Sequence, residues 1–289
     1  MAEKTALAFR TGAALLCLAW SCAAPAQRID DKVIKIPVKV TDVFGKVIEQ
    51  DITVTVWEEA GRKRYPLMVL NHGRASTAKG RADVARARYS EASRWLTSLG
   101  WSVWVPTRVG YGVTGGPDPE DTGSCTKKNY PPGYVVSAEQ SRQVIERARQ
   151  RPDIDGSKIV VAGQSYGGTT AITVAAMNLP GVVAGINFAG GGGGRPETHP
   201  GEPCLPAALE KMFAGYGKTA RVPTIWVYSE NDQYFKPKYT QAWFDAYKAQ
   251  GGTGEFVMFP SFRDNGHLLF TSGFALWKPV IEKFLAKIP

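Results

Sequence analysis

The sequence predicts an α/β fold: a mostly parallel eight-stranded sheet that begins with an antiparallel hairpin and carries helices on both faces. Residues 33–40 and 51–57 alternate apolar and polar side chains, as half-buried antiparallel strands do. From residue 65 onward, short continuous apolar runs alternate with helical stretches. That second pattern is typical of parallel strands buried on both faces and joined by crossover helices.

The six apolar runs expected to form the parallel strands are residues 66–70, 102–106, 159–162, 183–188, 224–228 and 255–259. The expected helices are residues 89–99, 138–150, 168–179, 205–216, 238–250 and 273–288. Ser137 is the predicted N-cap of the second helix, and Pro152 ends it. Ligands bind beyond the carboxyl ends of the strands in such sheets, so the loops leaving those ends are expected to hold the chemistry.

The first 26 residues have the layout of a bacterial export signal. Lys4 and Arg10 precede an apolar stretch at residues 11–20, and small residues follow up to Ala26. The apolar stretch is too short for the roughly 20 residues of a membrane-spanning helix. Cleavage after Ala26 and a periplasmic or secreted protein are therefore predicted, with lipid attachment at Cys22 as the alternative.

Residues 27–289 are expected to form one catalytic domain, because α/β enzymes of this length commonly share one core. Export would remove Cys17 and Cys22 and leave Cys125 and Cys204 in an oxidising compartment. A disulfide between these two is predicted, with two unpaired thiols as the alternative.

Charge and motif content narrow the class of partner. The formal net charge is +9, and the densest basic stretch, residues 74–88, lacks the interleaved aromatic residues of a nucleic-acid platform. We interpret this stretch as a solvated face or one that attracts anions. No spacing suggests a metal site or a phosphate loop. We therefore expect a small-molecule substrate, no cofactor, no nucleic acid and no integral membrane span, while the oligomeric state stays open.

The sharpest motif is G-x-S-x-G, formed by Gly163, Ser165 and Gly167 between an apolar run and a helical stretch. A nucleophile on a tight strand-to-helix turn needs small residues two positions before and after it. Ser165 is therefore the predicted nucleophile, against an ordinary glycine-rich turn.

A serine hydroxyl needs a general base, and the chain has three histidines. His267 follows the last predicted strand, which is where this order of elements places the base. His199 lies in a loop rich in proline and glycine, where a surface role is expected, and His72 is expected to be structural.

The acid that orients the imidazole is expected after the strand at residues 224–228. Asp232 is the choice, with Glu230 as the alternative; Asp264 is close to His267 in sequence but is expected to form a turn.

Two backbone amides are candidates to bind the oxyanion. One belongs to Tyr166, which follows the nucleophile at a helix N-terminus. The other is expected in the loop after Leu70, from Arg74 or else from Gly73.

Taken in order, a strand followed by His72-Gly73, the Gly163–Gly168 motif, Asp232 and Gly266-His267 resemble the α/β-hydrolase superfamily, and most closely its dienelactone hydrolase-like branch. The resemblance spans nearly all of residues 27–289. It implies a cofactor-free serine hydrolase that forms an acyl-enzyme, with small carboxylic esters as substrates. Dienelactone hydrolases proper use a cysteine nucleophile, so their lactone specificity does not carry over.

The substrate pocket is predicted from two loops: a long one at residues 107–136, and the loop that holds residues 190–194 and then Cys204. The disulfide would clamp these loops together. Tyr111, Tyr234 and Phe235 are the pocket candidates, beside Tyr166. No large helical cap is evident, so an open site and short acyl groups are expected. Two other functions stay open: a peptidase or amidase of the prolyl-oligopeptidase kind, without its propeller domain, and a non-catalytic binding protein.

Overall fold

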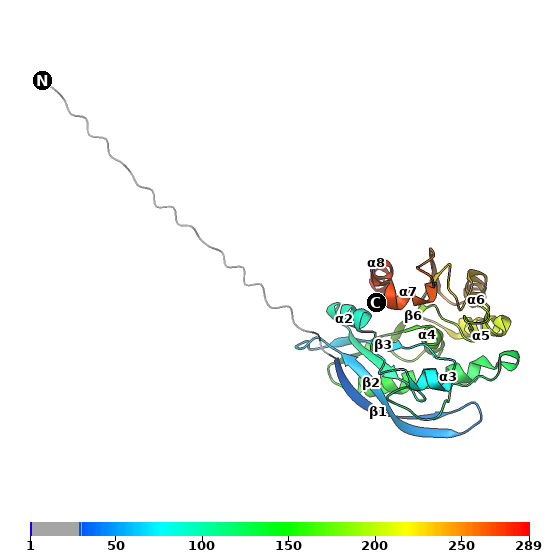
Figure 1. The fold of residues 1–289 in the computed structure, drawn as a ribbon. Coiled ribbons are helices and arrows are strands. Elements are labelled where there is room, and N and C mark those ends of the chain that lie inside the picture. The colour runs from blue at the N-terminus through cyan, green and yellow to red at the C-terminus, as the bar shows by residue number, and fades with distance from the viewer. Residues whose placement is uncertain (2–28, 30) are drawn as a thin grey trace.

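One eight-stranded sheet lies at the centre of the protein, in the order β1-β2-β4-β3-β5-β6-β7-β8 (Figure 1). β1 pairs antiparallel with β2, β2 pairs antiparallel with β4, and the remaining neighbours are parallel. The strands are β1 Asp31–Thr41, β2 Val47–Trp57, β3 Tyr65–Asn71, β4 Ser102–Thr107, β5 Ile154–Gln164, β6 Val182–Phe188, β7 Thr224–Ser229 and β8 Gly254–Phe259. The predicted fold class, including the antiparallel hairpin, is confirmed.

This structure is a computed structural model that describes residue 1, residue 29 and residues 31–289. Apart from Met1, the predicted export signal at residues 1–26, with Cys22, lies outside the described residues. Within the described part of the chain, no helix is long and apolar enough to cross a membrane.

Helices cover both faces of the sheet (Figure 1). Apolar side chains of α2, α7 and α8 pack on one face, and those of α3, α4, α5 and α6 pack on the other. The helices are α1 Ala78–Ala82, α2 Ser90–Ser98, α3 Tyr130–Arg149, α4 Tyr166–Ala176, α5 Pro206–Thr219, α6 Pro237–Ala249, α7 Leu269–Ser272 and α8 Phe274–Leu285, with short 3₁₀ turns η1 Cys125–Lys127 and η2 Gly266–Leu268.

The continuous apolar runs follow from this two-sided burial. In β3, Met68 and Leu70 pack toward α2 and α8, whereas Leu67 and Val69 pack toward α3 and α4. Successive side chains of a strand point to opposite faces, so a strand with helices on both sides must be apolar at every position.

Helix α3 corrects one prediction. It begins at Tyr130, eight positions before the predicted start, and Ser137 is not an N-cap but a buried residue inside the helix. The Ser137 hydroxyl hydrogen-bonds the Tyr134 carbonyl and the Thr170 hydroxyl. Two prolines in the first turn concealed the true start, because proline is tolerated there, where the backbone N–H has no helical partner.

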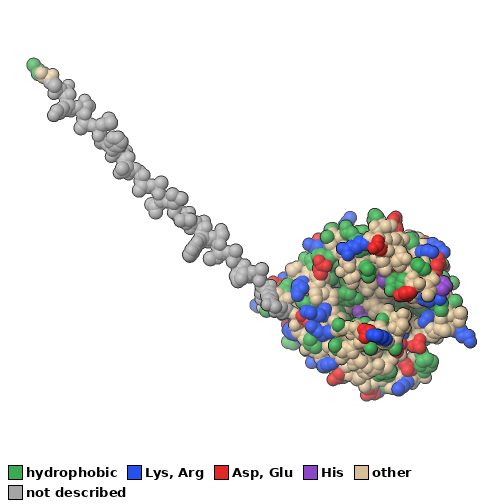
Figure 2. All heavy atoms as spheres, viewed as in Figure 1, with side chains coloured by type: hydrophobic (Ala, Val, Ile, Leu, Met, Phe, Trp, Pro, Cys, Tyr) green, Lys and Arg blue, Asp and Glu red, His purple; other side chains and the backbone are tan. Residues whose placement is uncertain are grey.

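The basic stretch at residues 74–88 is paired with carboxylates. Arg74 and Arg81 both contact Asp118, at 2.6 Å and 3.0 Å. Arg86 and Arg88 both contact Asp31. Figure 2 shows basic and acidic side chains interspersed over the visible face rather than gathered by sign. These pairs weaken the interpretation of the stretch as an anion-attracting face.

Candidate active site

Ser165 lies on a strained turn between β5 and α4. Its φ of 58° and ψ of −125° fall in a region that side chains of L residues rarely adopt. The turn is possible only because its flanking residues lack a Cβ: one on Gly163 would overlap the Gly167 carbonyl, and one on Gly167 would overlap the Asn71 carbonyl. This geometry is the one expected of a nucleophile lifted from the end of a sheet.

His267 lies in η2, after β8, with its ring against Asp232. The imidazole Nδ1 is 2.9 Å from Oδ2 of Asp232 and 3.1 Å from Oδ1. Asp232 follows β7, is 3% exposed, and its Oδ1 also accepts hydrogen bonds from the Tyr234 and Phe235 backbone N–H groups. These two donors fix the carboxylate, so the imidazole has a rigid partner at Nδ1.

Gln164 connects the turn that carries Ser165 to the loop that carries His267. Its side-chain Nε2 donates to the His267 carbonyl at 3.3 Å, which joins the residue before Ser165 to the histidine loop. The Tyr234 ring stacks on the imidazole, with 4.0 Å between ring centroids, and Phe235 meets it edge-on. These contacts restrict the orientation of the His267 ring.

The alternative acid and base candidates lie elsewhere. Glu230 and Asp264 are exposed, and their side chains make no hydrogen bond or ion pair with His267 among the described residues. His199 is exposed and contacts the neighbouring Thr198 hydroxyl. His72 is buried behind the loop that follows β3.

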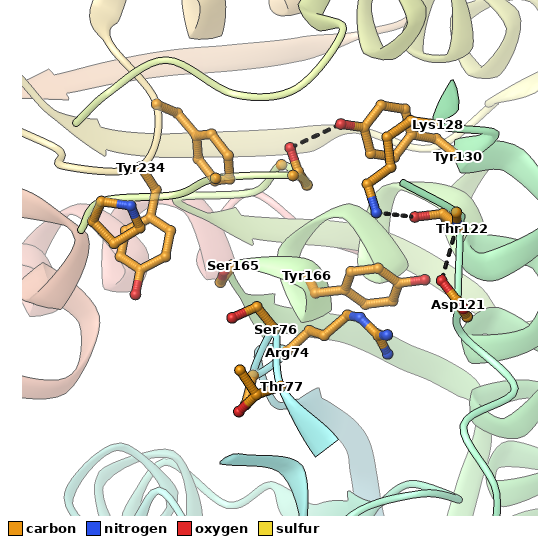
Figure 3. Close-up of a pocket in the computed structure, with 18 of the residues that line it drawn as sticks. Arg74, Ser76, Thr77, Asp121, Thr122, Lys128, Tyr130, Ser165, Tyr166 and Tyr234 are labelled. Atoms are coloured by element: carbon orange, nitrogen blue, oxygen red, sulfur yellow. Dashed lines mark hydrogen bonds between the residues drawn. The ribbon is translucent and has the colours of Figure 1, made fainter. Parts of the chain in front are cut away.

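A pocket of about 390 Å³ opens at Ser165. Figure 3 shows Ser165 between Tyr234 on one side and Arg74 with Tyr166 on the other. The residues that line the pocket come from four loops and from the starts of α3 and α4: Arg74, Ala75, Ser76, Thr77, Asp121, Thr122, Gly123, Lys128, Tyr130, Ser165, Tyr166, Gly191, Gly192, Gly193, Gly194, Pro196, Glu197, Tyr234 and Phe235.

Two of the three pocket candidates, Tyr234 and Phe235, line this pocket, and the third, Tyr111, does not. Tyr111 is fully buried, and its hydroxyl donates to Glu120 at 2.7 Å and accepts from Arg74 at 3.2 Å. The prediction for Tyr111 was wrong. A tyrosine between two glycines is compatible with a residue that lines a pocket and equally with one that is buried inside a folded loop.

The disulfide between Cys125 and Cys204 is present, as predicted. It joins the loop that carries Asp121 and Lys128 to the loop of glycines 191–194. The Tyr130 hydroxyl reinforces the junction by donating to the Cys204 carbonyl. Both connected loops line the pocket, so the covalent bond fixes the distance between two of its walls.

Two of the described side chains that line the pocket are cationic, Arg74 and Lys128, and only Arg74 forms an ion pair with a carboxylate. Arg74 makes two hydrogen bonds to Asp118, at 2.7 Å and 2.6 Å, and these ionic contacts raise the pKa of its guanidinium despite its burial. Lys128 donates to the Thr122 hydroxyl at 3.2 Å, and among the described residues no carboxylate lies within 4.0 Å of its ammonium. Burial lowers the pKa of Lys128. Among the described residues its ammonium therefore makes no direct ion pair, although the charge of Asp121 acts on it from a greater distance.

The two predicted oxyanion amides flank Ser165. Tyr166 is the first residue of α4, where a backbone N–H has no partner within the helix and lies at its positive end. Gly73 contacts the nucleophile turn, because a Cβ on it would lie 3.2 Å from Cβ of Ser165. Arg74 follows Gly73 and lines the pocket.

Sequence reasoning missed Lys128, Tyr130 and the buried pair Arg108–Glu120. Lys128 lies in an irregular loop, and Tyr130 begins a helix whose start the sequence did not reveal, so no periodicity marks either residue. Arg108 carried one signal, since a charged residue directly after a strand that is buried on both faces needs a buried partner.

The sheet order, the strained serine turn after β5 and the histidine after β8 decide the architecture. The fold is that of the α/β-hydrolases. No protein-family model and no curated protein sequence matches this chain. Solved structures do match, at identities that establish the fold alone.

Three solved α/β-hydrolases illustrate the match. A Klebsiella pneumoniae protein provisionally named a dienelactone hydrolase aligns with a TM-score of 0.58 and 14% identity, over 88% of this chain and 98% of its own. A Pyrococcus furiosus esterase gives 0.54 and 15%, over 88% and 90%. An acylaminoacyl peptidase from Pyrococcus horikoshii gives 0.61 and 13%, over 90% of this chain but only 42% of its own.

Proposed function

We propose that this chain is an exported serine hydrolase that cleaves small carboxylic esters, with Ser165, His267 and Asp232 as its catalytic triad. The observation that carries the proposal is the buried Asp232–His267 pair beside the strained turn of Ser165. A carboxylate on Nδ1 fixes the tautomer in which Nε2 is free to take a proton. The known α/β-hydrolase structures that share the fold include an esterase.

The proposed reaction has two steps. Ser165 Oγ attacks the ester carbonyl while His267 Nε2 takes the hydroxyl proton, and the Tyr166 and Arg74 backbone N–H groups bind the oxyanion. The tetrahedral intermediate collapses, the alcohol leaves with the proton from His267, and an acyl-enzyme remains. Water, deprotonated by His267, then attacks the acyl carbonyl and releases the acid and the free serine.

Short acyl groups fit this pocket better than long ones. The cavity of about 390 Å³ is lined by Asp121, Thr122 and Lys128, which a long alkyl chain would desolvate without giving them a hydrogen-bond partner. A series of nitrophenyl esters from acetate to palmitate tests this. Turnover should fall as the chain lengthens, and faster cleavage of palmitate would contradict the substrate class.

Labelling with a fluorophosphonate probe tests the nucleophile. The wild type should be labelled, Ser165→Ala should not, and Ser76→Ala should be labelled like the wild type. Ser76 is the matched control because it is the other serine that lines the pocket. Folding of each variant is checked by circular dichroism. A folded wild type that does not react would favour a non-catalytic binding protein.

Amide hydrolysis is the second candidate, since an acylaminoacyl peptidase shares the fold. This chain spans less than half of that protein, so the peptidase activity is only a proposal here. Acyl-peptide amides assayed beside the esters decide between the two. Higher kcat/KM on the amides would favour the peptidase.

Export is tested in a bacterial host that expresses the full chain. The expected outcome is a periplasmic or secreted protein whose sequence begins at Gln27. A membrane-bound product that carries lipid at Cys22 would favour the lipid-anchored alternative.

A further inference from the structure

A buried polar cluster lies behind the loop that follows β3. Arg108 and Glu120 are both fully buried and paired, with 2.5 Å between Arg108 Nε and Glu120 Oε1. The second Glu120 oxygen accepts the Tyr111 hydroxyl. The desolvation penalty of a buried ion pair offsets much of its electrostatic attraction. Such a pair is therefore weak evidence for a role in stability alone. Its remaining hydrogen bonds indicate another role.

The remaining hydrogen bonds of Arg108 go to the backbone of the loop beside Ser165. Nη1 donates to the His72 carbonyl at 2.8 Å, and Nη2 donates to the Gly73 carbonyl at 3.4 Å. The planar guanidinium can bind both carbonyls and Glu120 at once, which an ammonium on a flexible stem could not do with the same geometry. Two consecutive peptide groups of the loop are thereby held through their carbonyls.

The His72 side chain supplies a second hydrogen-bond donor to the Gly73 carbonyl. Its Nδ1 is 2.7 Å from the Gly73 oxygen, and a carbonyl only accepts, so Nδ1 carries the hydrogen. Nε2 then accepts from the Arg108 backbone N–H at 3.1 Å. Burial and the Arg108 charge hold the pKa of His72 well below its usual value, so the ring stays neutral and keeps this tautomer.

The planarity of the peptide bond transmits this arrangement to Arg74. In a trans peptide the N–H points opposite to the preceding C=O. The Gly73 carbonyl is turned into the buried cluster, so the Arg74 N–H points away from it, and Arg74 lines the pocket that contains Ser165. Hydrogen bonds received by a carbonyl also polarise its amide and strengthen the N–H as a donor.

We propose that His72 and Arg108 are positioning residues that orient and polarise the Gly73–Arg74 amide so that its N–H binds the oxyanion. The inference rests on the proposed function. Neither side chain touches the substrate; both act through one peptide group. Their effect should therefore fall on kcat and leave KM for a short ester unchanged, because the oxyanion forms only after binding.

Two substitutions of His72 separate this role from a structural one. In His72→Asn the side-chain NH₂ replaces Nδ1 and can still donate to the Gly73 carbonyl, whereas the acceptor for Arg108 is lost. In His72→Gln the side-chain oxygen replaces Nε2 and can still accept from Arg108, whereas the donor to Gly73 is lost. Each variant gives up one of two buried hydrogen bonds, so comparable losses of thermal stability are expected.

We expect kcat for a short ester to stay within about threefold of wild type in His72→Asn and to fall by about 10- to 100-fold in His72→Gln, as for a weakened oxyanion donor. A trifluoromethyl ketone inhibitor, which forms an oxyanion on the serine, should lose affinity by the same factor. Arg108→Lys is the second variant, with kcat lowered and KM retained.

The outcomes are distinguishable. Equal kcat losses in His72→Asn and His72→Gln, a change in KM alone, or an unchanged inhibitor affinity in His72→Gln would overturn the positioning role. If His72→Gln does not fold, Arg108→Lys decides, and wild-type kcat in that variant overturns the proposal. A wild type that reacts with no fluorophosphonate refutes the proposed function itself.

Discussion

Removal of the Cys125–Cys204 bond should lower the thermal stability of the protein strongly. The two cysteines are 79 residues apart in sequence. The loop-closure entropy of a cross-link over that length corresponds to about 4.5 kcal/mol at 25 °C, and native disulfides typically contribute about 2 to 4 kcal/mol. For a chain of this size, such a loss lowers Tm by about 4 to 8 °C.

Differential scanning calorimetry with and without a phosphine reductant measures the effect. Thiol titration establishes that the bond has been reduced. The matched control is the double variant Cys125→Ala/Cys204→Ala, whose Tm should already be low and should not respond to the reductant. Two titrated thiols together with a Tm within about 1 °C of the oxidised protein would refute the reasoning, because the loop-closure relation requires a shift several times larger.

Three further predictions concern the site. Gly167→Ala should destabilise the fold by about 3 kcal/mol in urea unfolding, because the new Cβ would overlap the Asn71 carbonyl, whereas Gly215→Ala, with open space around it in α5, should not destabilise it. Asp232→Asn should lower ester kcat by about 10⁴-fold through the wrong imidazole tautomer; a loss below tenfold would contradict its role. Lys128→Gln should raise KM about fivefold for an anionic short ester and leave KM for its neutral analogue unchanged, since a half-buried cation attracts a negative charge more strongly than an exposed one. Equal KM changes for both esters would contradict it.

The sheet was predictable from the sequence because a strand that is buried on both faces appears there as a continuous apolar run. Every side chain of β4 is buried, so residues 102–106 read as an apolar run whatever their distant neighbours are. The same holds for the turn at Ser165, whose two glycines lie within a few positions of the serine. Local signals of this kind survive in one sequence.

The start of α3 and the position of Tyr111 were not predictable for the opposite reason. Tyr130 is an N-terminal helix residue whose place depends on the carbonyl groups of Gly192 and Cys204, more than 60 positions away in sequence. The cluster around Arg108 likewise forms only when β3 and β4 lie side by side. Contacts made across the fold leave no periodic pattern in the chain.

The glycine run at residues 191–194 limits how this pocket can be redesigned. A Cβ on Gly191 would meet the Phe235 ring at 2.7 Å, and one on Gly192 would meet the Tyr134 hydroxyl at 2.5 Å. Both aromatic side chains are buried and cannot move aside freely. One wall of the pocket is therefore bare main chain with no position open to side-chain variation. An engineer seeking a new substrate range has to work on the other residues that line the pocket, such as Ser76, Thr77 and Lys128.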